Sequence, residues 1–282
     1  MLTKRKEPEA ITKTGEYELE SIRYDSAFLD RVVNVDIYNP FRYFPSGNVS
    51  LLLVNDGQDL RQMSFINILT SLLHNQTISP LLVVAMHCNE DRRLEYGTAD
   101  VLDYMNRGAR ARYHRKFILR ELLPFMQSRI HPFAFNDSGI AGFSLGGLSA
   151  MDIGWANQEI FNRIGVFSGS FWWRKKALED GYIEEKDRIM HELIKAGTYH
   201  GKQQYFLQTG LLDEKMDRNH NGIIDSVDDT LDIIKALKET GVNSARNIKY
   251  LELEDGRHDV ATWARAWPEF LKWGWPASAM LD

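Results

Sequence analysis

The hydrophobic positions of the chain fall into short runs that predict β-strands. The runs 51–54 and 81–84 are apolar without alternation, a pattern typical of parallel strands that are covered on both faces. Seven runs are predicted as strands on this basis: 32–38, 49–54, 81–86, 139–143, 163–167, 205–209 and 248–253.

Between these runs, apolar side chains recur every three or four residues, which is the period of an amphipathic helix. The clearest examples lie over 117–130, 231–240 and 263–271. Because strands and helices alternate to the C-terminus, we predict an α/β fold with a mostly parallel central sheet and helices on both faces. In such a sheet, ligands bind beyond the carboxyl ends of the strands.

Composition places the chain among ordinary globular proteins. Of its 282 residues, 44% are hydrophobic and 26% are charged, which excludes collagen-like and disordered classes. No linker or internal repeat divides the sequence, so we predict a single domain over 19–282 after an N-terminal extension over 1–18. The 34 Lys and Arg residues are outnumbered by 39 Asp and Glu, and this net charge of −5 argues against nucleic-acid and membrane partners.

The first residues and the cysteine content bear on the compartment. The N-terminus is basic but lacks the apolar core of a signal peptide, and no apolar run approaches 18 residues. Cys88 is the single cysteine, so no internal disulfide can form. The expectation is a cytoplasmic protein, with a secreted form left open, and no feature of the sequence specifies an oligomeric state.

A G-x-S-x-G motif supplies a candidate nucleophile. Gly142-Phe143-Ser144-Leu145-Gly146 follows a predicted strand and precedes a helix-compatible stretch. In the sharp turn that this context requires, side chains two positions before and after the serine would clash, while the serine itself is exposed and strained. The motif therefore predicts Ser144 as a nucleophile, with a glycine-rich packing turn as the alternative.

Position along the chain selects a base and an acid. In an α/β-hydrolase the acid and then the histidine follow the serine, each at the end of a later strand. Among eight histidines, only His258 follows a late strand, and Asp213 follows the strand at 205–209. Three other carboxylates remain open as alternatives for the acid: Glu214, Asp229 and Asp255.

Acyl transfer also needs donors for the oxyanion that forms on the ester carbonyl. The N–H of Leu145, directly after the nucleophile, is one candidate. The second candidate is the N–H of Gln58, since Gly57 lets the loop after the strand at 49–54 turn inward. The alternative for this loop is a plain Asp-Gly turn.

Together these segments resemble the esterase D and enterochelin-esterase-like group of α/β-hydrolases, also called the putative esterase family, from about 19 to 275. The resemblance rests on five segments: 55–59, 93–97, 142–147, 167–173, and 256–259 with Trp263 following. It implies serine hydrolysis of a small-molecule ester, with Ser144, Asp213 and His258 as the triad and no organic cofactor.

The same resemblance implies residues at the mouth of the pocket. Arg93, Glu95, Tyr96 and Trp172 would line it, and one of the adjacent Trp172 and Trp173 is expected to pack in the core. Relatives act on siderophore trilactones, feruloyl or acetyl esters and S-formylglutathione, and one branch transfers acyl groups between sugars. An acyltransferase on the same triad is therefore an alternative. A non-catalytic binding module on the same scaffold, dependent on the calcium loop described next, is a second alternative.

A second pattern, over 217–228, matches a calcium-binding loop of the EF-hand or dockerin type. Oxygen-bearing side chains fall at loop positions one, three, five, nine and twelve, with Gly222 at position six for the sharp turn. We expect calcium here as a structural ion that orders the loop after Asp213. The predicted ligands are Asp217, Asn219, Asn221, Ile223 through its carbonyl, Asp225 and Asp228.

Overall fold

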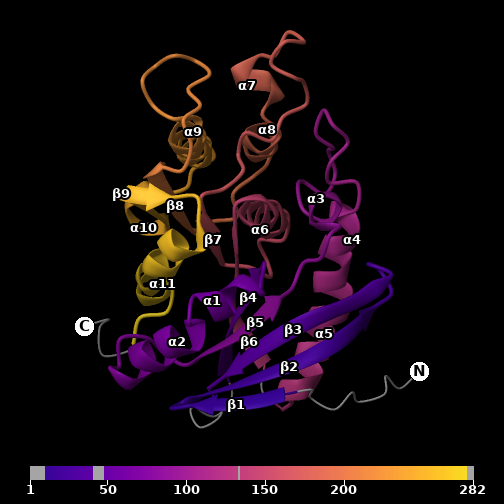
Figure 1. The fold of residues 1–282 in the computed structure, drawn as a ribbon, viewed down its shortest axis with the longest axis vertical. Helices are drawn as coiled ribbons and strands as arrows, with labels where there is room; N and C mark the ends of the chain where they lie inside the picture. The colour runs from indigo at the N-terminus through magenta and orange to yellow at the C-terminus, as the bar shows by residue number, and fades with distance from the viewer. Residues whose placement is uncertain (1–9, 41–47, 133, 278–282) are drawn as a thin grey trace.

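The computed structural model describes residues 10–40, 48–132 and 134–277, which build one nine-stranded sheet (Figure 1). The strand order across the sheet is β1-β2-β3-β5-β4-β6-β7-β8-β9. The strands are β1 (Ala10–Thr14), β2 (Tyr17–Ser26), β3 (Arg31–Asn39), β4 (Asn48–Asn55), β5 (Leu81–Met86), β6 (Ala134–Phe143), β7 (Arg163–Phe167), β8 (Gln204–Leu212) and β9 (Ile248–Arg257).

Helices occupy most of the connections between these strands. They are α1 (Asp59–Gln62), α2 (Phe65–His74), α3 (Arg92–Glu95), α4 (Ala111–Lys116), the π-helical turn η1 (Phe117–Leu122), α5 (Leu123–Ile130), α6 (Leu145–Ala156), α7 (Glu184–Asp187), α8 (Ile189–Ala196), α9 (Asp225–Glu239), α10 (Ser244–Asn247) and α11 (Val260–Gly274). Within the described ranges, no helix is both long and apolar enough to cross a bilayer.

The predicted fold class is confirmed. The pairs from β5 through β4, β6, β7 and β8 to β9 are all parallel. All seven predicted strands are present, most of them somewhat longer than predicted. The first three strands pair antiparallel, and β3 joins β5 in the same sense.

Two strands were not predicted, because β1 and β2 are rich in charged and polar side chains. They lie at one edge of the sheet and meet solvent on part of their surface. Ala10–Thr14 and the start of β2 fall within the segment predicted as an extension, whereas residues 1–9 of that segment lie outside the described residues.

Each face of the sheet packs against its own group of helices (Figure 1). On one face, η1, α6, α8 and α9 contribute buried side chains such as Phe117 and Met151. On the other face, α2 and α11 supply Phe65, Trp267 and Phe270. This three-layer arrangement leaves the carboxyl ends of the parallel strands free to carry the loops in which the predicted site residues lie.

Candidate active site

Ser144 lies on a strained turn between β6 and α6. Its backbone has φ of 53° and ψ of −121°, a conformation that few residues other than glycine adopt. A Cβ on Gly142 would overlap the backbone of Gly146, and a Cβ on Gly146 would lie 2.5 Å from Asp56 Oδ2. The two motif glycines therefore have the steric role that the sequence predicts, and the half-buried Ser144 lies at the tip of the turn.

A second serine, which sequence reasoning missed, lies against the nucleophile. The Oγ atoms of Ser144 and Ser170 are 3.3 Å apart, and the Ser170 N–H donates to the Ser144 carbonyl at 3.1 Å. Ser170 follows β7, the parallel neighbour of β6. The rule that ligand sites lie beyond parallel strand ends could have identified this loop, but only the structure shows the contact.

The predicted acid and base emerge from adjacent parallel strands. Asp213 follows β8 and His258 follows β9. Gly210 and Gly256 bring the two strand ends together, because a Cβ on Gly210 would overlap the Gly256 backbone. One carboxylate oxygen of Asp213, Oδ2, accepts the N–H of Gly210 at 3.2 Å.

Asp213 and His258 interact electrostatically. Desolvation lowers the pKa of His258, although part of the ring is exposed, and the nearby Asp213 charge opposes this shift. Desolvation also raises the pKa of Asp213, and the charge of His258 counteracts that effect. Among the described residues, no hydrogen bond joins Ser144 to His258 or His258 to Asp213. In free enzymes such bonds are often long and shorten only when substrate is bound.

The loop after β4 brings Gln58 to the same end of the sheet. Asp56 has a positive φ of 59°, and the Gly57 N–H donates to the Met86 carbonyl at 2.8 Å. The Gln58 side chain is fixed by the Cys88 N–H, which donates to Gln58 Oε1 at 3.2 Å. No hydrogen bond to another described residue uses the main-chain N–H of Gln58 or that of Leu145.

Arg92 is a further residue that sequence reasoning missed. It makes two hydrogen bonds to the buried Asp56 carboxylate, at 2.8 and 2.7 Å, and lies over the Tyr96 ring at 5.4 Å. Its positive charge also contributes to the lowered pKa of His258. Arg92 thus fixes the Gln58 loop and adds positive charge to the site.

The structure corrects two of the residues expected at the mouth of the pocket. Glu95 is fully buried and accepts two hydrogen bonds from Arg31, at 2.8 and 2.7 Å. Tyr96 is 1% exposed, and its hydroxyl accepts the N–H of Asp56 at 3.1 Å. Both side chains therefore act inside the fold. The expectation differed because the resemblance identifies their segment but not the direction in which each side chain points.

The other expected mouth residues remain accessible. Arg93 is exposed, and Trp172 is half-buried beneath the Arg107 guanidinium, which lies 4.9 Å from the Trp172 ring. Trp173 is fully buried, and its indole N–H donates to Thr98 at 3.1 Å. One of the two adjacent tryptophans therefore packs in the core, as expected.

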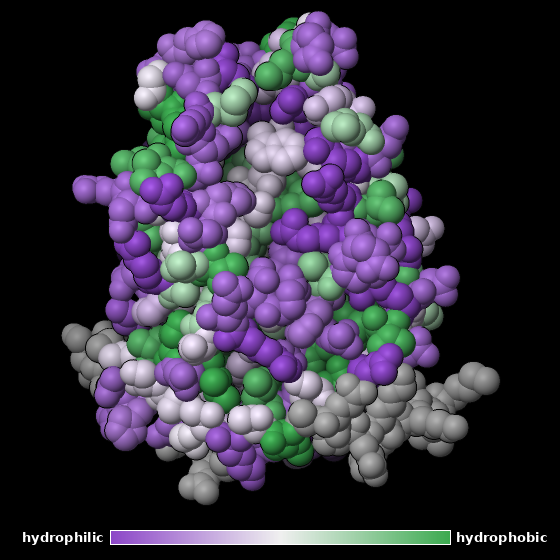
Figure 2. Space-filling model, viewed as in Figure 1, coloured by the Kyte–Doolittle hydropathy of each residue, from purple (hydrophilic) through white to green (hydrophobic). Residues whose placement is uncertain are grey.

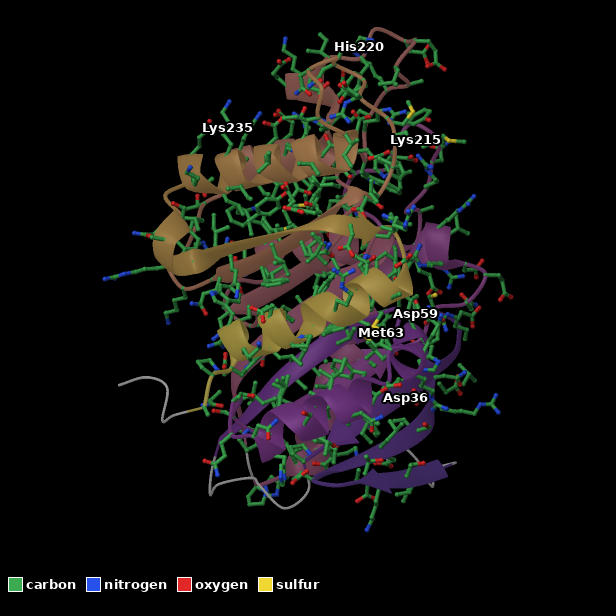
Figure 3. The ribbon with its side chains drawn as sticks, turned by 60° about the vertical axis from the view of Figure 1, so that its left-hand side comes forward. Asp36, Asp59, Met63, Lys215, His220 and Lys235 are labelled. Atoms are coloured by element: carbon green, nitrogen blue, oxygen red, sulfur yellow. The ribbon has the colours of Figure 1, made fainter. Side chains whose placement is uncertain are left out.

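The predicted calcium loop projects from the end of the molecule that carries α7 and α9, where Figure 2 shows many hydrophilic side chains, and His220 lies at its outer end (Figure 3). The amides of Asn219 and Asn221 both donate to Asp228 Oδ2, at 2.7 and 3.2 Å. Asp217 accepts the N–H groups of Asn221 and Gly222 at 3.1 and 2.9 Å. Three predicted ligands thus converge at one point.

One other predicted ligand, Asp225, is already engaged by the chain itself. Asp225 begins α9, and its carboxylate accepts the Arg218 N–H at 2.8 Å and lies 3.2 Å from the Arg218 guanidinium. Ile223 is exposed. Within the ranges that the structure describes, no group of three or more His, Cys, Asp or Glu side chains is arranged to hold a metal ion. Any site here would depend on amide and carbonyl oxygens beside the carboxylates.

A buried ion network anchors this loop through the chain's own residues. The Arg218 side chain turns inward and pairs with Glu184 on α7 and Asp229 on α9. Arg188 also pairs with Asp229, at 2.7 Å. Sequence reasoning missed this role for Arg218, because an arginine inside a polar loop is usually solvent-exposed.

Comparison with known proteins places this geometry in a family. The model of the family described as Putative esterase matches residues 26–273. A search of curated proteins finds no match.

Several solved structures share the fold. The enterochelin esterase of Shigella flexneri superposes with a TM-score of 0.71 at 21% identity, covering 96% of this chain and 61% of that one. The siderophore hydrolase EstB of Aspergillus nidulans has a TM-score of 0.66 at 16% identity, covering 95% and 99%. An IroE-like serine hydrolase from Shewanella oneidensis has a TM-score of 0.64 at 18% identity, covering 90% of this chain and 79% of that one.

The chain spans about 60% of the length of the enterochelin esterase structures that it matches. Identities at this level establish a shared fold, so the assignment to a family rests on the family model. That model covers most of the chain, including the nucleophile turn and both later strand ends. The chain therefore belongs to the Putative esterase family.

Proposed function

We propose that this protein cleaves carboxylic esters through an acyl-enzyme formed on Ser144. The observation that carries the proposal is the strained conformation of Ser144 between β6 and α6, at a turn where Gly142 and Gly146 leave no room for side chains. Asp213 and His258 support the assignment, because they follow β8 and β9, the last two strands of the sheet, at the same carboxyl end as Ser144.

The chemistry follows from these groups. Ser144 Oγ attacks the ester carbonyl while His258 takes the hydroxyl proton, and Asp213 orients the imidazole and stabilises its charged form. The N–H groups of Gln58 and Leu145 stabilise the oxyanion. When the tetrahedral intermediate collapses, the alcohol leaves with the proton from His258. Water then repeats the sequence on the acyl-enzyme and releases the acid.

Labelling with a fluorophosphonate probe tests the nucleophile. Wild-type protein and Ser144→Ala are compared, together with turnover of short p-nitrophenyl esters. The matched control is Ser138→Ala, because Ser138 is a buried serine on β6 away from the turn. We expect Ser144→Ala to lose both labelling and turnover, and Ser138→Ala to retain both. Labelling that survives in Ser144→Ala would rule out this nucleophile.

The substrate class is a further part of the proposal. Related structures were solved with enterobactin and with 2,3-dihydroxy-N-benzoyl-serine. We propose a small-molecule ester as the substrate and place enterobactin first in a panel that also contains feruloyl and acetyl esters. Hydrolysis of a simple acetyl ester that is much faster than that of enterobactin would redirect the assignment.

We also propose that the loop 217–228 binds calcium. Its spacing matches a calcium loop, and the convergence of Asn219 and Asn221 on Asp228 supports the proposal. An Asn amide can turn to present its oxygen to a cation in place of the N–H₂ group. Asp217, Asp225 and the Ile223 carbonyl would complete the ligand set.

Calorimetric titration of the full chain with calcium tests this site. We expect binding heat for the wild type and at least tenfold weaker affinity for Asp228→Ala. Asp255→Ala is the control, because Asp255 is an exposed carboxylate outside the loop. Absence of heat in the wild type, with an unchanged melting temperature in chelator, would exclude the calcium site.

A further inference from the structure

Trp263 on α11 connects the catalytic histidine to a buried serine. Its ring meets the His258 ring edge-on, with centroids 5.3 Å apart and planes at 81°, and stacks on Phe143 at 5.0 Å. Its indole N–H donates to Ser168 Oγ at 3.0 Å in a buried contact. One side chain thus contacts the base, the residue before the nucleophile and a polar group on the loop after β7.

Ser168 is held in an unusual backbone conformation. Its φ is 47°, in the left-handed region that favours glycine, and its N–H donates to the Gln208 carbonyl at 2.8 Å. The residue is 1% exposed, so no solvent satisfies its hydroxyl. Glycine at this position would adopt the same backbone conformation without strain, but it would lack the hydroxyl group. This contrast points to a role for the hydroxyl itself.

The Ser168 hydroxyl and the Asp213 carboxylate each have hydrogen-bonding capacity that the described contacts leave unused. Since Ser168 Oγ accepts a hydrogen bond from Trp263, its own hydrogen is free to be donated. Burial raises the pKa of Asp213, and the nearby Ser168 side chain opposes that shift by favouring the charged form. Asp213 Oδ1 is buried and accepts no hydrogen bond from any of the described residues. Gly210 is thus the one described donor to the carboxylate, and Oδ1 remains open to a donor such as the Ser168 hydroxyl.

We propose that Trp263 and Ser168 form a positioning relay, in which the indole N–H orients the Ser168 hydroxyl toward Asp213 while the indole ring holds His258 in place. The inference rests on the proposed Ser144, His258 and Asp213 mechanism. Neither relay residue touches the reacting atoms, so both act through the triad.

Two substitutions separate the relay from simple packing. Ser168→Gly removes the hydroxyl and suits the local backbone, and Trp263→Phe keeps an aromatic ring but removes the N–H. The matched control is Trp267→Phe, one turn further along α11, because the Trp267 indole donates to Met63 Sδ at 3.2 Å rather than toward the triad. Met63 lies beside α11 (Figure 3).

Steady-state kinetics with a p-nitrophenyl ester give the first measurement. We expect Ser168→Gly to lower kcat about tenfold with KM unchanged, the effect of losing one hydrogen bond to a charged group. Trp263→Phe should lower kcat about fivefold. Because both act through one hydroxyl, the double variant should resemble Ser168→Gly rather than show the roughly fiftyfold product of two independent effects.

The pH profile of kcat/KM gives a readout that packing alone would not move. Without the Ser168 donor the pKa of Asp213 rises, so the carboxylate is neutralised at a higher pH and ceases to orient His258. The acid limb should therefore move to higher pH in Ser168→Gly. The other charged groups beside this pair, Asp259, Arg92 and Glu214, are unchanged in the variant.

The outcomes distinguish the relay from the mechanism on which it rests. Trp267→Phe should lower the melting temperature while keeping kcat within about twofold of wild type. The relay is overturned if Ser168→Gly and Trp263→Phe also keep kcat within about twofold of wild type, as Trp267→Phe should. It is likewise overturned if the effects of the two relay variants on kcat multiply. Full activity of Ser144→Ala would instead overturn the underlying mechanism, whatever the relay variants show.

Discussion

Gly146 illustrates, at the scale of single residues, how closely the nucleophile turn packs against the loop that carries Gln58. An added Cβ would lie 2.5 Å from Asp56 Oδ2 and 3.2 Å from Asn55 Cβ. Gly146→Ala should therefore displace Asp56 and, with it, the N–H of Gln58. Since losing one oxyanion donor costs about 100-fold or more in kcat, we expect a decrease of that size.

Steady-state kinetics and thermal melting check this prediction. Gly274→Ala serves as the control, because its added Cβ would meet only the flexible Arg163 side chain, at 3.3 Å. The control should retain wild-type kcat. A Gly146→Ala variant that is folded and within tenfold of wild-type kcat would show that the two loops move independently.

Asp152 gives a second prediction at the residue scale. This α6 carboxyl is 5% exposed and accepts the Ala99 N–H at 3.1 Å, and burial raises its pKa from 3.8 to about 7. The folded state therefore binds the proton more tightly than the unfolded state, so this group's contribution to stability falls as pH rises from about 4 to about 7. Asp152→Asn, which still offers an acceptor oxygen, should remove that loss.

Urea unfolding between pH 4 and pH 8 measures the effect. We expect wild type and Asp152→Asn to have similar free energies of unfolding at pH 4, with the variant more stable by about 2–4 kcal/mol at pH 8. A difference that stays constant across this range would show that Asp152 ionises normally in the folded protein.

At the scale of elements, the ion network between α7 and α9 determines how the loop 217–228 is held. Arg218 pairs with Glu184 and with Asp229, whose side chain is 1% exposed. Removing one partner of a buried pair leaves an uncompensated charge, which costs roughly 3–5 kcal/mol. We expect Arg218→Met to lose about that much stability in denaturant unfolding.

Arg265→Met is the matched control, because the Arg265 and Asp255 side chains are 51% and 71% exposed. An exposed pair contributes about 0–1 kcal/mol, so the control should unfold almost as wild type does. Equal losses in the two variants would mean that solvent reaches Arg218 and that the loop is anchored by other contacts.

The sequence predicted most directly those strands that carry a hydrophobic run. Runs such as 51–54 are apolar throughout, whereas β1 and β2 at the sheet edge mix polar and charged side chains with apolar ones, and no hydrophobic run marks them. The rule that site residues follow the carboxyl ends of parallel strands likewise identified Ser144 and the loops of Asp213 and His258. It could not find Ser170, Arg92 or the Trp263 contact, because each depends on which way a side chain points across a long-range contact.

At the scale of the whole molecule, one sheet joins both halves of the chain. β4 pairs with β5 on one side and with β6 on the other, and hydrophobic side chains from both halves share the two cores. Unfolding one half would expose the apolar faces of the other. We therefore expect the protein to unfold in a single cooperative transition.

The distribution of natural probes makes this expectation testable without new labels. All seven tryptophans lie at position 155 or later, and the single cysteine, Cys88, follows β5 in the N-terminal half. Burial raises the pKa of the Cys88 thiol to about 12, so the native protein should react slowly with thiol reagents. Tryptophan fluorescence then follows the C-terminal half, and Cys88 labelling follows the N-terminal half.

Both signals are measured across one urea series at equilibrium, with short labelling pulses. Equal midpoints and equal slopes for fluorescence and Cys88 labelling are expected if the sheet unfolds as a unit. A Cys88→Ser variant checks that the thiol does not itself alter the fluorescence transition. Labelling that begins at lower urea than the fluorescence change would mean that the segment containing β3 and β5 detaches first. The parallel pairing of β4 with β6 would then not be sufficient to hold the N-terminal half.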